Sequence, residues 1–279
     1  MIKEVKHTYK LGNTTLNRMG YGAMQLTGKG VWGDPDDKEN AKKVLQKAVE
    51  LGVNFIDTAD SYGPLTNEKL ISEALHPYAK DLHIATKSGL ERPGPDNWVP
   101  NGNPKHIREG IEGSLKRLKV DQIFLWQLHR IDSNVPVEKT LEPVIKAVEE
   151  GKIKHVGLSE VGVEEIKKVQ KILPIVSVQN MYNLGNQKWN DVVDYTAEQG
   201  IAFIPWYPLA SGPDSMEAQT KKLAQKYNAT PAQIALAWLL KRSENILLIP
   251  GTKSLNHLEE NYNAASIELT DEDFKSLEK

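Results

Sequence analysis

Short apolar segments alternate with longer amphipathic segments along nearly the whole chain. In the amphipathic segments the apolar residues recur with a period near 3.6, as at Val44, Leu45, Ala48 and Leu51, which is typical of a helix with one buried face. This spacing predicts helices that include residues 41–51, 107–118 and 137–150. The short apolar segments predict strands over residues 19–22, 53–57, 82–86, 122–128, 153–158, 175–179, 201–206 and 246–249.

Eight strands that alternate with helices predict an α/β fold, a closed parallel (β/α)8 TIM barrel. The chain has 279 residues, and such barrels commonly form one domain of about 250 residues, so we expect a single domain over residues 1–279. Gly52, Gly151 and Gly200 each follow a predicted helix, where a left-handed C-cap favours glycine. The glycines therefore support the predicted helix ends.

Three segments outside the barrel pattern carry further signals. Residues 7–16 contain a Gly-Asn pair between two short alternating runs, which predicts a β-hairpin that plugs the bottom of the barrel. Two long loops follow barrel strands: residues 25–37 contain Trp32, and residues 89–104 contain Trp98. Long aromatic loops at these places are either walls of a pocket or surface excursions anchored by a tryptophan.

The composition excludes several classes of partner and site. Lys and Arg number 35 against 37 Asp and Glu, a net charge of -2, so we expect no nucleic-acid and no membrane partner. No apolar stretch reaches the roughly 20 residues that cross a bilayer, and the N-terminus lacks the apolar core of a secretory signal. Cys is absent, which excludes disulfides and thiolate chemistry. We expect a cytoplasmic protein, although a secreted chain without Cys is compatible with the same composition.

Ionisable side chains follow three of the predicted strands. Asp57 and Tyr62 come after the strand that contains Phe55-Ile56, Lys87 follows the next strand, and His129 follows the one after it. Parallel strands of one barrel bring such residues together at its C-terminal rim, where these barrels hold their active sites. Taken singly, each residue also fits an ordinary role as a cap, a rim lysine, a core histidine or a loop tyrosine.

The four residue types together suit the protonation of a carbonyl oxygen while a reductant attacks the carbonyl carbon. A tyrosine that acts as an acid needs its pKa, about 10, drawn toward the working pH, and the Lys87 ammonium would do this by stabilising the Tyr62 phenolate. Asp57 would keep Lys87 charged and in place, and His129 would orient the carbonyl. No activated Ser or Cys nucleophile accompanies them, so acyl transfer is not expected.

Metal and common nucleotide motifs are missing from the sequence. The seven histidines include no pair at a metal-ligand spacing, and we expect no metal site. There is no Walker sequence. Residues 20–25 begin like a dinucleotide fingerprint but lack its last small residue, so a nucleotide would bind outside a Rossmann unit.

Four segments in combination resemble the aldo-keto reductases, in a bacterial branch that includes pyridoxal reductases. They are the Asp-Thr-Ala-x-x-Tyr-Gly segment at residues 57–63, Lys87, the Leu-His pair that ends at His129, and Ile-Pro-Gly-Thr-Lys at residues 249–253. The resemblance covers residues 11–263. It implies a barrel that binds NADP(H) in an extended pose at the C-terminal rim, with Tyr62 as the acid.

The resemblance also implies roles for residues that no spacing argument reaches. Asp57 and Lys87 would tune Tyr62, and His129 would orient the substrate. Cofactor binding is implied for Ser159, Gln179, Asn180, Trp206, Leu209, Ser211, Gly251, Thr252, Lys253, His257, Glu260 and Asn261. Substrate contacts are expected from Met24, Trp32 and Trp98, and the rings of the two tryptophans would flank a planar aromatic aldehyde.

Three positions depart from the family pattern. Glu160 stands where many relatives have Asn, so the nicotinamide carboxamide would be held differently. Tyr207 replaces a small polar residue beside the stacking Trp206, which would narrow the pocket. His257 stands where many members have Arg, which weakens the preference for NADP over NAD that Lys253 implies.

We therefore expect an NADPH-dependent reductase of small aldehydes or ketones, with pyridoxal as the leading candidate substrate. Two alternatives remain open at this level. Lys87 at a barrel-strand end would also suit a Schiff-base aldolase, which borohydride trapping would reveal. Some relatives are non-catalytic, NADP-sensing subunits, and such a protein would bind the cofactor without turnover.

Overall fold

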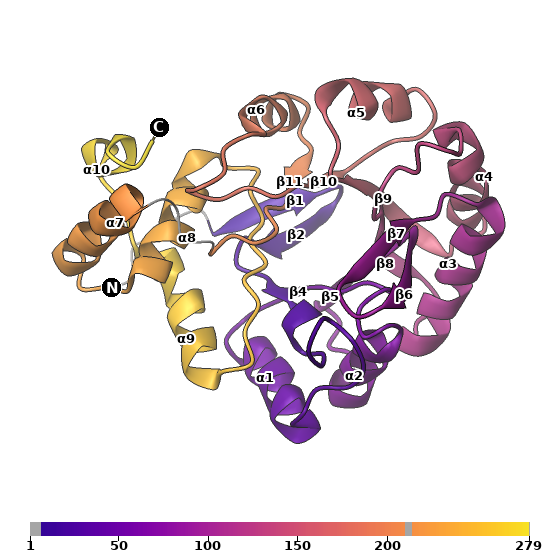
Figure 1. The fold of residues 1–279 in the computed structure, drawn as a ribbon, viewed down its shortest axis with the longest axis horizontal. Coiled ribbons are helices and arrows are strands. Elements are labelled where there is room, and N and C mark those ends of the chain that lie inside the picture. Colours follow the sequence, from indigo (N-terminus) through magenta and orange to yellow (C-terminus); the bar gives the residue numbers. More distant parts are fainter. Residues whose placement is uncertain (1–6, 210–213, 279) are drawn as a thin grey trace.

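The computed structural model describes residues 7–209 and 214–278. Its main element is a parallel sheet of seven strands in the order β11-β10-β9-β8-β5-β4-β3. The sheet curls around the centre of the molecule in Figure 1. Its strands are β3 (Tyr21–Gly22), β4 (Phe55–Asp57), β5 (His83–Ser88), β8 (Ile123–Leu128), β9 (Ile153–Ser159), β10 (Ser177–Gln179) and β11 (Ala202–Phe203).

The eighth predicted strand closes the ring. Residues 246–248 are not a named strand, but isolated parallel bridges join Phe203 to Ile246 on one edge and Met19 to Leu248 on the other. The amide of Leu248 donates to the carbonyl of Arg18 at 2.8 Å, across the opposite edge from β11. The (β/α)8 barrel is confirmed, with β3 and β11 shorter than predicted.

Helices surround the barrel in Figure 1, and apolar residues on their inner faces pack in the core clusters around the sheet. Three of them match the predicted helices within a few residues at each end, and Gly52, Gly151 and Gly200 have positive φ after α1, α4 and α6. The helices are α1 (Lys38–Glu50), α2 (Thr66–Leu75), α3 (Pro104–Leu118), α4 (Val137–Glu149), α5 (Val163–Gln170), α6 (Asn190–Glu198), α7 (Asp214–Lys226), α8 (Pro231–Arg242), α9 (Leu255–Asn263) and α10 (Asp271–Lys275), with 3-10 turns at Ala23–Gln25 and Ala264–Ser266.

The predicted N-terminal hairpin is confirmed and closes the bottom of the barrel. Strands β1 (Thr8–Leu11) and β2 (Thr14–Asn17) pair antiparallel. Leu11 and Leu16 are fully buried and join the apolar cluster inside the barrel, with Phe55, Ala85, Leu125 and Leu247 among its members. The interior is therefore filled with side chains at this end, which leaves the opposite end for a site.

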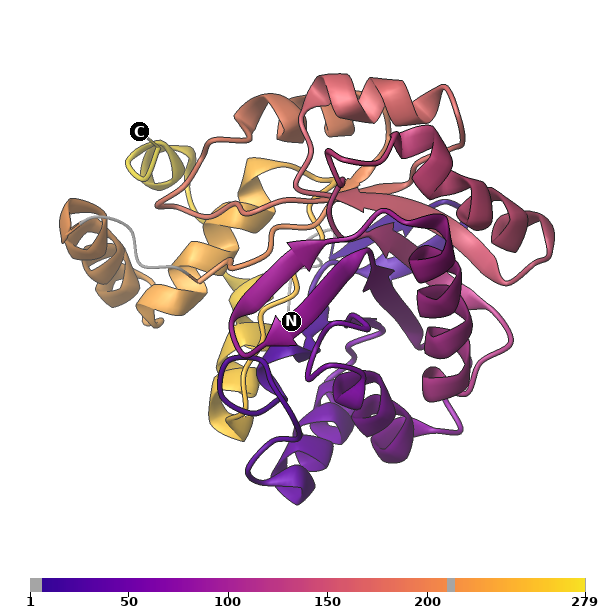
Figure 2. The same cartoon turned by 45° about the vertical axis from the view of Figure 1, so that its right-hand side comes forward.

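The loop prediction for residues 89–104 is wrong in part. Residues in this segment form a second hairpin of β6 (Leu90–Gly94) and β7 (Asn97–Pro100), turning at Asp96, whose φ is 54°. Figure 2 shows the hairpin in front of the barrel opening. The prolines at 93, 95 and 100 concealed this pairing in the sequence, because proline is tolerated only on edge strands such as these.

Within the described ranges no helix is long and apolar enough to cross a membrane.

Candidate active site

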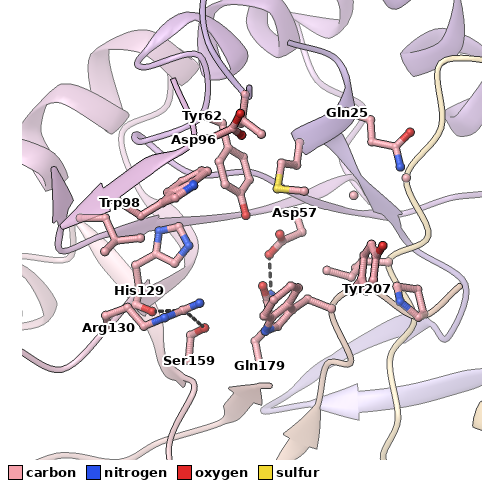
Figure 3. A pocket seen from close by; sticks show the side chains of 18 of the residues that line it. Gln25, Asp57, Tyr62, Asp96, Trp98, His129, Arg130, Ser159, Gln179 and Tyr207 are labelled. Atoms are coloured by element: carbon pink, nitrogen blue, oxygen red, sulfur yellow. Dashed lines mark hydrogen bonds between the residues drawn. The ribbon is translucent and has the colours of Figure 1, made fainter. Parts of the chain in front are cut away.

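A cavity of about 720 Å³ opens at the carboxyl ends of the barrel strands. Side chains from the barrel rim and the β6–β7 hairpin face one another across it in Figure 3. Its lining residues are Gly22, Met24, Gln25, Val31, Asp57, Tyr62, Leu90, Asp96, Trp98, Pro100, His129, Arg130, Ser159, Gln179, Trp206, Tyr207, Pro208, Leu209, Ile249 and Gly251. Ten of the predicted site residues are among them.

Asp57 and Lys87 form a buried ion pair in which Asp57 lines the cavity and Lys87 lies behind it. Both residues are almost completely shielded from solvent, and Lys87 Nζ donates to Asp57 Oδ1 at 2.5 Å. The same ammonium donates to the Thr58 carbonyl at 2.9 Å and to Tyr62 Oη at 3.3 Å. All three of its hydrogens therefore have acceptors, which fixes Lys87 in place.

The Tyr62 hydroxyl lies beside this pair and lines the cavity. Burial raises the pKa of Tyr62, while the Lys87 ammonium opposes that rise and Asp57 adds to it. The predicted fall of the Tyr62 pKa is therefore wrong for the protein alone, because desolvation of the phenolate outweighs the attraction of Lys87. The hydroxyl keeps its proton at neutral pH and has a cation beside it for when the proton leaves.

Two amides hold the second oxygen of Asp57. Gln179 Nε2 donates to Asp57 Oδ2 at 2.9 Å, and Gln127 Nε2 donates to the same atom at 3.2 Å. These bonds offset part of the cost of a buried carboxylate. Gln127, on β8, was not predicted, since a glutamine inside an apolar strand gives no functional signal in the sequence.

His129 is buried and lies edge-on to Tyr62, with ring centroids 5.8 Å apart. Its Nδ1 is 3.2 Å from Ser61 Oγ. Burial lowers the pKa of His129 well below its ordinary value, and Lys87, Arg130 and Arg92 lower it further. The ring is therefore neutral, and when Ser61 donates to Nδ1 the proton stays on Nε2, where it can be donated to a ligand oxygen.

Arg130 is a cavity residue that the sequence analysis missed. Its Nη1 donates to the His129 carbonyl at 2.6 Å and to Ser159 Oγ at 3.0 Å, as the dashed lines in Figure 3 show. Ser159 itself lines the cavity, as expected. The sequence did carry a signal for Arg130: it directly follows His129, and neighbouring residues at a strand end lie on the same rim of the barrel.

Glu160 holds the indole of Trp206. Its Oε1 accepts a hydrogen bond from Trp206 Nε1 at 2.7 Å and one from the Met181 amide at 2.5 Å. Glu160 has a φ of 55°, a costly conformation for a residue with a Cβ. The Glu160 side chain, which departs from the family pattern, therefore orients Trp206, and Trp206 lines the cavity. The neighbouring Tyr207 is 59% exposed.

Asn180 does not line the cavity. Its amide oxygen accepts from the Val161 amide at 3.1 Å, and its Nδ2 donates to the Val161 carbonyl at 2.8 Å. Both the oxygen and the nitrogen of the Asn180 side-chain amide are hydrogen-bonded to the Val161 backbone. Its predicted role at the cofactor stays a prediction. Leu209 lines the cavity, and Ser211 lies outside the described residues.

The loop before α9 extends from the cavity to the protein surface. Gly251 lines the cavity, and a Cβ added there would come within 2.6 Å of the Gly22 carbonyl oxygen. Thr252 is buried and its Oγ1 accepts from the Ser254 amide, whereas Lys253 and His257 are exposed.

The adenine-side pair predicted on α9 lies on the same stretch. Glu260 is half-buried, and its carbonyl accepts from Gln233 Nε2 at 2.9 Å. Asn261 is buried, and its Nδ2 has no hydrogen-bond partner among the described residues. Such an orphaned buried donor is rare and suggests a missing acceptor.

The two loop tryptophans both lie near the Arg92 guanidinium. The Arg92 guanidinium is 3.5 Å from the Trp98 ring centroid and 5.7 Å from that of Trp32. It also donates to the carbonyls of Gly30, Val31, Ser61 and Asn97. Trp98 and Met24 line the cavity, whereas Trp32 does not line it and lies near Arg92 instead.

In the described ranges no three His, Asp or Glu side chains are grouped to hold a metal ion.

Residues 18–279 match the model of the Aldo/keto reductase family. The chain belongs to this family. An uncharacterized oxidoreductase of Schizosaccharomyces pombe is 50% identical over 98% of this chain and 89% of that protein. The pyridoxine 4-dehydrogenase of Escherichia coli is 40% identical over 98% of this chain and 97% of that protein.

Solved aldo-keto reductases have the same fold. A thermostable member in complex with the inhibitor epalrestat has a TM-score of 0.85 at 26% identity, over 97% of this chain and 98% of that one. The enzyme of Klebsiella pneumoniae in complex with NADPH has a TM-score of 0.83 at 22% identity, over 98% of this chain and 94% of that one. The second likeness bears on the fold alone.

Proposed function

We propose that the protein is an NADPH-dependent reductase of small aldehydes and ketones, with Tyr62 as the proton donor. The observation that carries the proposal is the Tyr62 hydroxyl in the cavity wall, 3.3 Å from an ammonium whose counter-ion is Asp57. Bound NADPH would supply the hydride to the carbonyl carbon. Tyr62 gives its proton to the carbonyl oxygen, and His129 Nε2 holds that oxygen by a hydrogen bond.

The charge that develops on Tyr62 is met by groups already in place. As its proton leaves, the phenolate lies against Lys87, and Asp57 balances the charge of Lys87. Fixed groups of this kind stabilise a transition state without reorganisation. Gln127 and Gln179 hold Asp57, so the pair resists displacement when substrate enters.

The residues around the cavity fit an extended dinucleotide. Ser159, Gln179 and Trp206 would hold the nicotinamide, with the indole kept in position by Glu160. Gly251 leaves room for close approach, and Lys253 is an exposed cation just before α9, whose N-terminus favours anions. The unpartnered amide of Asn261 suits an acceptor on the adenine. A 2′-phosphate bound by Lys253 would favour NADPH over NADH.

Pyridoxal is the substrate we propose to test first. The relative at 40% identity is named a pyridoxine 4-dehydrogenase, which acts between an alcohol and the corresponding aldehyde. Trp98 offers an aromatic edge beside Tyr62 and His129, at centroid distances of 6.2 and 6.3 Å. Consumption of NADPH, followed by absorbance with a panel of aldehydes that includes pyridoxal, tests both the reaction and the substrate. Cofactor binding without oxidation on any member would favour the NADP-sensing subunit.

The Schiff-base alternative is disfavoured by the state of Lys87. A lysine nucleophile must be neutral, but Asp57 and Tyr62 raise the pKa of Lys87 by more than burial lowers it. Its three hydrogens are also donated to fixed acceptors. Borohydride treatment with an aldehyde should therefore leave Lys87 unmodified, and a covalent adduct on Lys87 would favour the aldolase.

A further inference from the structure

We propose that Arg130 forms an anion subsite in the cavity and that the preferred substrates are aldehydes carrying an anionic oxygen, either a carboxylate or an ionised phenol. This inference rests on the proposed reductase function and specifies its substrate class. Pyridoxal has a phenolic oxygen beside its aldehyde and falls within the class.

Arg130 is held at the edge of the reacting centre. It directly follows His129 at the end of β8, and its Nη1 is anchored to the His129 carbonyl and to Ser159 Oγ on β9. In Figure 3 its guanidinium lies between His129 and Ser159, on the same side of the cavity as Gln179. Two anchors from two strands fix the plane of the guanidinium, so its remaining donors point in a set direction.

The guanidinium has unused hydrogen-bonding capacity. Arginine carries five N–H donors, and in the described structure only those on Nη1 of Arg130 have an acceptor. No carboxylate in the described ranges lies within ion-pair distance of Arg130. The charge of Glu160 acts on Arg130, but the Glu160 Oε1 atom accepts hydrogen bonds from Trp206 and Met181. Nε and Nη2 are thus left for a ligand.

Other charges around the cavity are already committed or lie elsewhere. Among the described lining residues Arg130 is the one permanent cation, since Lys87 lies behind Asp57 and Tyr62. Asp57 is paired with Lys87, and Asp96 lies at the hairpin end of the cavity, away from Arg130 in Figure 3. An anionic group entering the cavity is therefore drawn to Arg130. Burial strengthens such a charge-assisted bond.

The subsite is close enough to the reacting groups to act on the same molecule. Arg130 directly follows His129, and both line the same cavity as Tyr62. The charge of Arg130 also contributes to lowering the pKa of His129, in keeping with this closeness. A planar bidentate contact to the anionic oxygen would then fix the angle at which the carbonyl meets Tyr62. Arg130 is in this sense a substrate-specificity residue.

The test compares pairs of aldehydes in which a methyl group removes the negative charge. Steady-state kcat/KM with saturating NADPH is measured for 2-, 3- and 4-carboxybenzaldehyde and for their methyl esters. A second pair, 2-hydroxybenzaldehyde and 2-methoxybenzaldehyde, is measured at pH values where the phenol is neutral and where it is ionised. The two series separate a carboxylate from a phenolate as the favoured anion.

Three variants accompany the wild type. Arg130→Met keeps an apolar stem and removes the charge, and Arg130→Lys keeps the charge without the planar fork. Arg108→Met removes an exposed arginine of α3 outside the cavity and controls for net charge. We expect Arg130→Met to lower kcat/KM for at least one anionic aldehyde about tenfold or more and for its neutral partner less than threefold, with partial rescue in Arg130→Lys.

The outcomes separate the possible roles of Arg130. An equal loss for charged and neutral aldehydes would mean that Arg130 acts only by holding Ser159 and His129, and would overturn the subsite. A wild-type preference for the neutral partners would overturn it as well. If no aldehyde is reduced, the proposed reductase function fails. Binding of benzoate against benzamide, followed by tryptophan fluorescence, then tests the subsite alone: weaker benzoate binding in Arg130→Met supports it, and unchanged binding overturns it.

Discussion

The end of the cavity at Tyr62, which we propose is the catalytic end, and the end toward α9 are built differently. Tyr62, Lys87 and Asp57 are buried, and each is fixed by bonds to at least one of the others. Lys253 and His257, before and on α9, are exposed, and their side chains make no hydrogen bond or ion pair in the described structure. At the Tyr62 end the side chains are already bonded to one another in the protein alone, whereas at the α9 end the side chains of Lys253 and His257 make no bonds in the described structure.

This difference has an energetic consequence. Removal of one member of a buried charge pair leaves the other uncompensated, so changes at the catalytic end should affect folding and chemistry together. Changes at exposed residues of the α9 end should affect only cofactor affinity, because those side chains stabilise little in the protein alone. The following four variants test this contrast in order of expected effect.

Lys87→Met should have the largest effect. We expect kcat/KM to fall about 10²–10⁴-fold and the free energy of unfolding to fall by about 3–5 kcal/mol, because Asp57 is left buried without its counter-ion. Adding Asp57→Asn should restore stability without restoring activity, as measured by urea unfolding and by turnover. Full stability in Lys87→Met would contradict the view that the pair is tightly coupled.

The pH profile of Lys87→Met adds a second measurement. In the proposed mechanism reduction requires protonated Tyr62, so activity should be present below the Tyr62 pKa and should be lost as the pH rises through it. Without Lys87, the largest effect that opposes the burial of Tyr62 is lost and only the smaller effect of Arg130 remains, so the basic limb should move to higher pH or disappear. A deuterated cofactor must first show that hydride transfer limits the rate. An unchanged profile with weaker substrate binding would make Lys87 an ordinary rim lysine.

Tyr62→Phe should separate chemistry from folding at the same end. The ring stays in its contacts with Trp98 and His129 while only the hydroxyl is lost. We expect kcat to fall at least about 10²-fold, with NADPH affinity and the unfolding midpoint nearly unchanged. Near-normal turnover of a slow aldehyde would exclude Tyr62 as the acid.

Asp60→Asn should show that the buried end also carries an acid whose charge is poorly compensated. Burial, with Glu68 second, raises the pKa of Asp60 from 3.8 to about 7, and its Oδ1 has no partner among the described residues. Because the folded-state pKa is the higher one, stability from protonated Asp60 is fully present below pH 3.8 and is lost as the pH rises toward 7. The free energy of unfolding of Asp60→Asn, relative to that of the wild type, should therefore be higher at pH 8 than at pH 4 by about 1–3 kcal/mol. Parallel urea-unfolding curves at both pH values would contradict the shift.

Lys253→Ala should have the smallest effect and should leave folding unchanged. We expect about tenfold weaker binding of NADPH, about 1.4 kcal/mol, and little change for NADH, since only NADPH carries the 2′-phosphate. Fluorescence titration measures both, and Lys43→Ala on the exposed side of α1 serves as the control. Equal affinities of wild type and variant for NADPH would show that Lys253 is only a surface lysine.

The sequence by itself determined the barrel and the place of the residues that we propose are catalytic. Asp57, Lys87 and His129 follow apolar strands, and the parallel arrangement forces such residues to one rim. The N-terminal hairpin was equally readable, because a short turn between alternating runs is a local signal. These features depend on the order of residues along single strands and turns.

Tertiary structure decided what depends on contacts between distant segments. Glu160 reaches Trp206, Arg130 reaches Ser159, and Arg92 links residues 30–31, Ser61 and the β6–β7 hairpin. The direction in which the Tyr62 pKa shifts could not be predicted from the sequence either, because it depends on how far burial outweighs a neighbouring charge. Periodicity reports which face of an element is buried, but only the packed barrel determines which polar groups meet there and how much water they lose.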